Sequence, residues 1–485
     1  MSSNAWQGRR VRGAGRGLVT GTVVAAWILA AAAWAQPADW PHPSAMSFDP
    51  VDFEPLEPRR EVLDNGLVVY LAEDPELPLV QGTAYVDAPA LFDPPDKTGL
   101  SAFTANLLRE GGAGGRAPDE LNEELEFLGA QVEASADDAL ASVSFSALQD
   151  NVDEVLPIWR DVLVAPDFAP ERVEVQRQRQ LESIRRVADQ PVQLAVREFQ
   201  ARVAEGHPAG AYPTEATIQN ITREDLRAFH QAYYAPSSTV LAVTGDFDAD
   251  QMLARLERVF GDWTHQAEPP PELPTFDPDP EAKVYLAQKD VQQSVLIVGT
   301  PAMPAYDAPY TAFTAANHVL GAGGFTSRLF QEIRSRRGLA YATGSVLTQG
   351  FEVPGVFLAY AFTRADATAQ TLQLLLDELR RMHREGPSPD ELARSVETLV
   401  NQSLFRDTSV AARTERTARV ELLGLPADYF ERHLDRLRSL TPEEAREAVR
   451  NVYDPKDLVI LVLGDEQSFD LPLDDFGPVE RIEVE

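Results

Sequence analysis

Hydrophobic and polar residues recur along the chain with one of two periods, and the period changes from segment to segment. Short β-branched runs and strict alternation indicate strands, whereas apolar residues three and four apart indicate amphipathic helices. Before residue 265 the pattern predicts strands over 61–71 (a hairpin folded at Asn65-Gly66), 80–88 and 129–148, and helices over 98–109, 118–128, 150–163 and 170–188. Farther on it predicts strands over 282–285, 293–301, 340–348 and 355–362, and helices over 309–320, 326–337, 366–385 and 388–406.

The closing segments of the two halves repeat each other. Residues 221–246 (ITREDLRAFHQAYYAPSSTVLAVTGD) align without gaps with 440–465 (LTPEEAREAVRNVYDPKDLVILVLGD). In each copy a Thr caps an amphipathic helix with an acidic first turn, Tyr-x-Pro ends that helix, and a β-branched strand closes at Gly-Asp. The repeated pattern therefore predicts an α+β fold of two tandem homologous domains, each a mainly antiparallel sheet covered by helices.

Two proline-rich segments divide the chain. Residues 36–57 are acidic and rich in proline, and 265–281 combine many prolines with almost no periodicity. We expect the following organisation: a signal peptide over 1–35, an extended arm over 36–57, a first domain over 58–264, a linker over 265–281, a second domain over 282–475 and a C-terminal tail over 476–485.

The N-terminus is typical of an export signal. A basic start precedes the apolar run 18–35, which ends in the small-x-small site Ala33-Trp34-Ala35. We expect cleavage before Gln36, a periplasmic location and no membrane insertion after cleavage. An uncleaved anchor is the alternative, because the apolar run is of borderline length for spanning a bilayer.

Charge and composition exclude several functions. The formal net charge is −33, and so acidic a surface repels nucleic-acid backbones. The absence of cysteine excludes disulfides, thiolate zinc sites and cysteine nucleophiles, and no two of the seven histidines are spaced as a metal-binding pair on one helix. The glycine run 321–324 has no preceding strand and no following Lys-Ser/Thr, so we expect a turn and not a phosphate-binding loop.

One segment of the second half carries a family signature. Residues 321–346 (GAGGFTSRLFQEIRSRRGLAYATGSV) combine a glycine-rich turn, a helix that ends at Gly338 and a strand that starts with Leu-Ala-Tyr. This segment resembles the second-half signature of the pitrilysin/insulinase family of zinc peptidases, especially its processing-peptidase branch. The resemblance extends over essentially the whole chain after the signal. It implies a half-shell built from two α+β domains. Two such half-shells enclose a chamber for unfolded peptides.

The resemblance also implies that the zinc site is lost. Active members carry H-x-x-E-H after a Gly-Leu pair in the first half, and the equivalent stretch here is 99–108. The two histidine positions and the glutamate position fall on Ala102, Asn106 and Ala105, while the family's third ligand position falls on Glu182. Because catalytic zinc usually needs three protein ligands, we expect no metal on this chain, no catalytic residue acting alone, and zinc in a partner subunit.

The other part of the family's machinery is retained. Its substrate-binding Arg and Tyr correspond to Arg334 and Tyr341. An Arg offers several fixed donors to a peptide carbonyl, and a phenol can donate to the oxyanion formed as water attacks. A structural alternative is that Arg334, Arg336 and Arg337 offset the dipole at the end of a helix while Tyr341 fills a strand.

Three functions remain open from the sequence. In the first, the chain is the non-catalytic subunit of an exported heterodimeric zinc metallopeptidase and lends Arg334 and Tyr341 to a homologous H-x-x-E-H subunit for proteolysis of peptides or unfolded segments. In the second, it is a catalytically dead peptide-binding or structural scaffold of the periplasm. The third, an active peptidase with an unusual metal site, is disfavoured by the scattered histidines.

Overall fold

The computed structural model describes residues 57–137, 139–276, 283–403, 405 and 409–484. The predicted signal peptide, all of the predicted arm except Glu57, and residues 277–281 of the predicted linker lie outside these ranges. Within them, no helix combines the length and the apolar character needed to cross a bilayer.

The first sheet has six strands in the order β1-β2-β6-β3-β5-β4. They are β1 (Arg59–Val62), β2 (Val68–Glu73), β3 (Leu79–Val86), β4 (Gln131–Ala136), β5 (Ala141–Leu148) and β6 (Thr239–Gly245). Neighbouring strands are antiparallel except β2 and β6, which are parallel. The expected hairpin joins β1 to β2, and its turn places Gly66 at a φ of 88°, a value that glycine adopts without steric strain.

The second sheet repeats this plan in the order β12-β7-β11-β8-β10-β9. Its strands are β7 (Val284–Gln288), β8 (Gln293–Pro301), β9 (Ala340–Leu347), β10 (Val356–Arg364), β11 (Val459–Gly464) and β12 (Val479–Ile482). The parallel pair β7–β11 occupies the place of β2–β6 in the first sheet. The segment expected as a C-terminal tail contains β12, which extends the sheet by pairing in parallel with β7.

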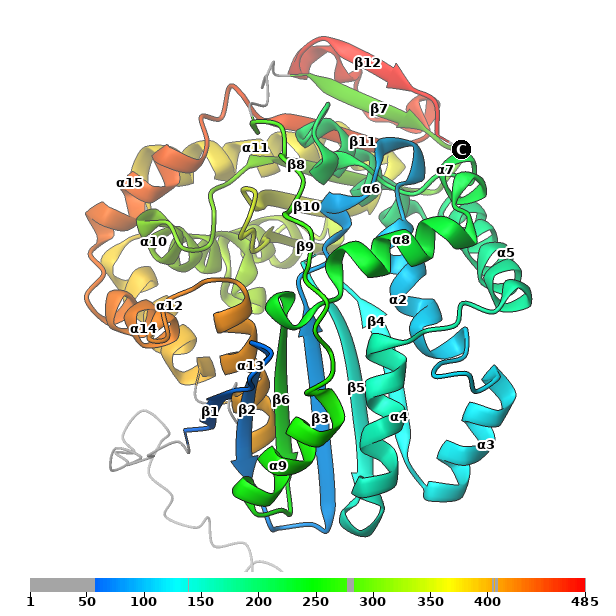
Figure 1. Ribbon diagram of the computed structural model, residues 1–485. Coiled ribbons are helices and arrows are strands. Elements are labelled where there is room, and N and C mark those ends of the chain that lie inside the picture. Colours follow the sequence, from blue (N-terminus) through cyan, green and yellow to red (C-terminus); the bar gives the residue numbers. More distant parts are fainter. Residues whose placement is uncertain (1–56, 138, 277–282, 404, 406–408, 485) are drawn as a thin grey trace, which may run out of the picture. The chain divides into compact units, whose positions relative to one another are not determined.

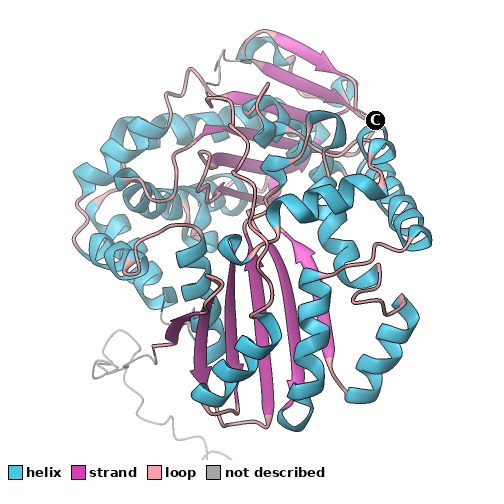
Figure 2. Ribbon diagram, viewed as in Figure 1, coloured by secondary structure: helices cyan, strands magenta, loops and turns pink. Residues whose placement is uncertain are grey.

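Helices pack against both sheets (Figures 1 and 2). Those of the first half are α2 (Leu100–Glu110), α3 (Pro118–Leu128), α4 (Val152–Val164), α5 (Pro170–Val187), α6 (Pro191–Val203), α7 (Glu215–Asn220), α8 (Arg223–Tyr233) and α9 (Ala249–Phe260). Those of the second half are α10 (Ala308–Asn317), α11 (Thr368–Glu385), α12 (Pro389–Ser403), α13 (Val410–Leu422), α14 (Tyr429–Arg438) and α15 (Pro442–Val452). The predicted α+β class and the duplication are confirmed.

The repeated segments adopt the same local structure. Thr222 and Thr441 each cap a helix, α8 and α15, by accepting a hydrogen bond from the backbone N–H three residues on. Strand β6 or β11 follows at the centre of its sheet. Every residue of these two strands is buried, which explains why they are mostly apolar and do not alternate with exposed polar residues.

Each sheet is covered on one face by a helix from the other half. Leu241 and Val243 of β6 face the core of the first half, whereas Val240 and Ala242 face the opposite way and pack with Ala418 of α13. In the same manner α6 packs on β8 and β11 of the second sheet. The two halves are therefore joined by an exchange of helices (Figure 1).

Candidate functional site

The degenerate zinc motif lies on α2. The helix starts where Asp93 accepts hydrogen bonds from the backbone N–H groups of Gly99 (2.7 Å) and Ser101 (2.8 Å). Ala102 and Asn106, one turn apart on the same face, are partly buried, and Ala105 is fully buried.

Glu182 lies on α5, which packs against α2. Its carboxylate is 54% exposed and forms an ion pair of 2.9 Å with Arg186, one turn farther along the helix. Across the described residues, no group of three or more His, Asp or Glu side chains could hold a metal ion. Two alanines and an asparagine offer neither imidazole nor carboxylate, so the residues of this stretch do not fit a zinc site.

Arg334 and Tyr341 lie close together in the second half. Arg334 belongs to η9 (Phe330–Ser335), a π-helical turn, and Tyr341 to β9, the edge strand of the second sheet. The guanidinium carbon of Arg334 lies 4.8 Å from the ring centroid of Phe330 and 5.4 Å from that of Tyr341. Cation–π contacts with two rings hold the guanidinium in place without using its N–H groups in hydrogen bonds to described residues. Tyr341 is 78% exposed, so its phenol is accessible from the solvent.

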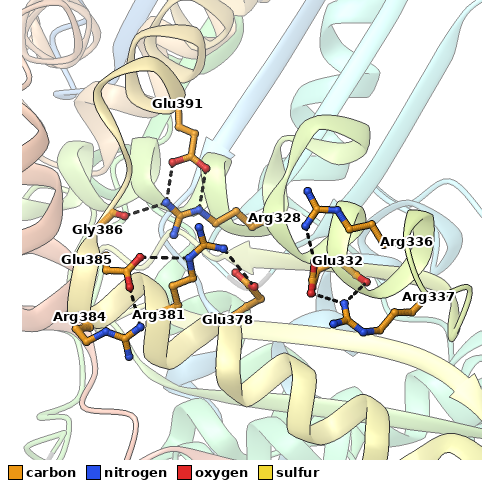
Figure 3. Close-up of polar contacts among 10 residues, drawn as sticks. All are labelled: Arg328, Glu332, Arg336, Arg337, Glu378, Arg381, Arg384, Glu385, Gly386 and Glu391. Atoms are coloured by element: carbon orange, nitrogen blue, oxygen red, sulfur yellow. Dashed lines mark hydrogen bonds and ion pairs between the residues drawn. The ribbon is translucent and has the colours of Figure 1, made fainter.

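The neighbouring arginines are engaged differently (Figure 3). Glu332 forms ion pairs with both Arg336 (2.7 Å) and Arg337, and these arginines hold the pKa of Glu332 below its ordinary value. The side chain of Arg334 contacts two aromatic rings and forms no hydrogen bond or ion pair with any described residue. Of the three arginines that could offset the helix dipole, two share the single carboxylate of Glu332, and the guanidinium of Arg334 has no carboxylate partner among the described residues.

A partly buried ion pair fixes the start of this segment. Arg328 binds the carboxylate of Glu391 through two nitrogens (2.7 and 2.8 Å) and also donates to the carbonyl of Gly386 (Figure 3). The hydrogen bond from Arg328 is the main reason that the pKa of Glu391 falls to about 2. The side chain of Arg328 is only 9% exposed. This two-point contact joins the segment that carries Arg334 to the first turn of α12.

Next to Arg334 is a cavity of about 600 Å³. Its wall comes from α10, η9, β9, β10 and a second π-helical turn, η7 (His318–Ala322). Phe325 is 73% exposed at the cavity and contacts Phe330 edge-on at 4.8 Å, so an aromatic row runs from Phe325 to Tyr341. Burial lowers the pKa of His318, which favours a neutral imidazole. The sequence pattern did not identify Phe325, Phe330 or His318 as candidate site residues. The two phenylalanines, five positions apart in the signature, were the available signal of an aromatic site.

The glycine run 321–324 forms a turn, as expected. A Cβ on Gly321 would lie 2.3 Å from the backbone nitrogen of Ser345, so only glycine allows η7 to approach β9 this closely. The helix expected over 326–337 is irregular instead. A 3₁₀ turn covers Gly324–Thr326 and the π-helical turn η9 follows; such π turns often occur at functional sites.

Comparisons with protein families match both halves. Residues 68–212 match the family described as "Insulinase (Peptidase family M16)", and residues 220–399 match the one described as "Peptidase M16 inactive domain". An uncharacterized zinc protease from Streptomyces coelicolor is 26% identical over 84% of this chain and 91% of its own length. An uncharacterized zinc protease from Bacillus subtilis is 23% identical over 75% of this chain and 88% of its own length.

Solved structures share the fold. A peptidase M16 inactive domain from Pseudomonas fluorescens superposes with a TM-score of 0.76 at 24% identity, covering 84% of this chain and 98% of that one. The periplasmic protease PqqL from Escherichia coli superposes with a TM-score of 0.71 at 16% identity, over 92% of this chain and 51% of that one.

Proposed function

Because the chain belongs to peptidase family M16, we propose that it is the non-catalytic subunit of an exported heterodimeric zinc metallopeptidase. A homologous partner with H-x-x-E-H holds the zinc, and this chain supplies Arg334 and Tyr341 to bind the peptide. The observation that carries the proposal is the stacking of Arg334 between Phe330 and Tyr341 without a carboxylate partner among the described residues.

The roles of the two residues follow from their chemistry. The fixed N–H donors of Arg334 hydrogen-bond a carbonyl of the bound peptide, and the exposed phenol of Tyr341 donates to the oxyanion that develops at the cleaved bond. The adjacent cavity, with its aromatic row, accommodates an apolar side chain of the same peptide. This chain's contribution is thus to bind and orient the peptide.

Reconstitution tests the proposal. When the chain is mixed with an H-x-x-E-H subunit from the same organism, we expect cleavage of an unstructured fluorogenic peptide only in the complex. Arg334→Ala and Tyr341→Phe should each lower kcat/KM roughly 10²–10³-fold, the loss typical of one preorganised donor. Arg336→Ala is the matched control, because Arg336 is exposed and already paired with Glu332. Normal assembly with unchanged cleavage by both variants would contradict the assignment.

The second candidate is a catalytically dead peptide-binding scaffold. The same surface supports it, since the aromatic row and Arg334 could bind peptides without a catalytic partner. Fluorescence anisotropy with the isolated chain and a labelled unstructured peptide distinguishes the two candidate functions. Binding that depends on Arg334, together with no cleavage in any pairing, favours the scaffold.

Export rests on the basic and apolar N-terminal segment, which lies outside the described residues. We expect the mature chain to start near Gln36 in the periplasm. N-terminal sequencing of protein from the native host checks this, and an intact Met1 form in the cytosol would contradict it.

A further inference from the structure

A small polar cavity of about 210 Å³ lies at the C-terminal end of α2, apart from the Arg334 site. Helices α2, α3 and α5 line it. Its lining residues are Arg109, Glu110, Pro118, Asn122, Arg172 and Arg179. Three guanidinium groups from two helices therefore meet around one recess.

Two of the three arginines are paired. Arg179 contacts Glu110 at 2.5 Å, and Arg172 contacts Asp119 at 2.6 Å. The guanidinium group of Arg109 forms no hydrogen bond or ion pair with the part of the chain that the structure describes, and its Nε atom is buried without a partner. Three positive charges thus face two negative ones, and the surplus charge belongs to Arg109.

The position of Arg109 at a helix end does not account for this arrangement. A cation near a helix C-terminus is favourable, but an exposed arginine would supply that interaction without burying an unpaired donor. A buried polar group without a partner costs free energy that a hydrogen-bonded ligand would recover. The strongly acidic character of the whole chain is screened beyond about 10 Å at ordinary salt, so the local surplus governs what binds in the cavity.

We propose that this cavity binds one oxyanion group, a carboxylate or a phosphate. Arg109 supplies the uncommitted charge, Arg172 and Arg179 add donors at the rim, and the amide of Asn122 can donate to a remaining oxygen. Planar guanidinium groups match both kinds of anion. The volume suits a single such group, for example the free C-terminus of a peptide, and not a whole peptide. The site is independent of the function proposed above.

Isothermal titration of the full mature chain tests the proposal with three probes. They are inorganic phosphate, trialanine with a free carboxylate, and trialanine amide. We expect saturable binding of phosphate, of free trialanine, or of both, and no binding of the amide. Phosphate alone identifies a phosphate site, and the free tripeptide alone identifies a carboxylate site.

Variants locate the binding. Arg109→Gln should weaken it about tenfold or more, the effect expected from losing a charged hydrogen-bonding partner. Arg172→Gln should also weaken it and serves if Arg109→Gln does not fold. Arg364→Gln is the control, because Arg364 is exposed and paired with Asp366 outside the cavity. The proposal is overturned if the wild type binds no anion at millimolar concentrations, if the amide binds as well as the acid, or if the folded cavity variants bind like the control.

Discussion

At the scale of single residues, the family signature singles out Arg334, whereas residue chemistry alone could not separate it from its neighbours. Arg334, Arg336 and Arg337 have the same chemistry and almost the same place in the chain. What distinguishes them is direction: Glu332 faces Arg336 and Arg337, while Arg334 turns between two aromatic rings. Such a direction depends on the local winding of the helix, which is a π turn here and not the α-helix that the periodicity predicts.

His230 of the repeated segment gives a prediction on stability. Its Nε2–H donates to the carbonyl of Leu163 (2.9 Å), and its ring stacks on Tyr234. Desolvation lowers the pKa of His230 to about 4, despite an opposing contribution from the hydrogen bond to Leu163. In the unfolded chain His230 takes up a proton below about pH 6.5, whereas in the folded chain it stays neutral down to about pH 4. The free energy of unfolding therefore decreases as the pH falls from 6.5 to 4.

We therefore expect the wild type to lose about 1–2 kcal/mol more than His230→Gln when the pH is lowered from 7 to 5. Urea-induced unfolding at the two pH values measures the difference. Titration of the remaining histidines and carboxylates is common to both proteins and cancels in the comparison. An identical pH dependence of the two proteins would show that His230 titrates normally in the folded state.

At the scale of elements, the sequence predicts the strands and helices that repeat and misses those that join the halves. Thr222 and Thr441 marked the starts of α8 and α15 because N-capping is a local interaction. Helix α6 was not anticipated, since its apolar face packs on strands far away in the sequence. The predominantly apolar strands β6 and β11 were the available signal, because a strand with no polar alternation needs cover on both faces.

The exchanged helix α6 leads to a second stability prediction. Leu194 is fully buried among residues such as Tyr285 and Leu461 of the second sheet. Leu194→Ala should lower the free energy of unfolding by about 2–5 kcal/mol, as other truncations of buried leucines do. Val192 lies on the same helix and is 40% exposed, so Val192→Ala should change stability by less than about 0.5 kcal/mol. Equal effects in urea-induced unfolding would contradict the packing of α6 on the second sheet.

At the scale of the whole molecule, the halves have diverged in chemistry while keeping one architecture. In the first half α2 packs against α5, and Ala102 and Asn106 stand on α2 at the positions where the resemblance implies the histidine ligands. The second half retains Arg334 and Tyr341 on a segment anchored by the Arg328–Glu391 pair. The motif comparison could point to these positions because it depends on residue identity alone, and their roles stay predictions. It could not predict the aromatic row and cavity, which depend on how η7, η9 and β9 pack.

The residues at the zinc-ligand positions predict how the chain responds to zinc. We expect the wild type to retain no stoichiometric zinc after incubation with the metal and dialysis. In Ala102→His/Asn106→His, two imidazoles one turn apart on α2 and the carboxylate of Glu182 on the adjacent α5 would supply the three ligands of a zinc site with one open position. The exposed ion pair of Glu182 with Arg186 is a weak competitor, since such pairs contribute at most about 1 kcal/mol. We therefore expect elemental analysis to find about one zinc per chain in this double variant.

Adding Glu182→Gln to the double variant should remove most of that zinc, because the third ligand loses its charge. Ala102→His alone is the matched control and should remain metal-free, since one imidazole and one carboxylate fall short of three ligands. Zinc in the wild type would contradict the loss of the site. Zinc in the double variant that is insensitive to Glu182→Gln would show that α5 does not place Glu182 where the family places its third ligand. The zinc content of these variants thus distinguishes two cases. In one, α2 and α5 keep the geometry of a zinc site and lack only the ligands; in the other, their geometry has also changed.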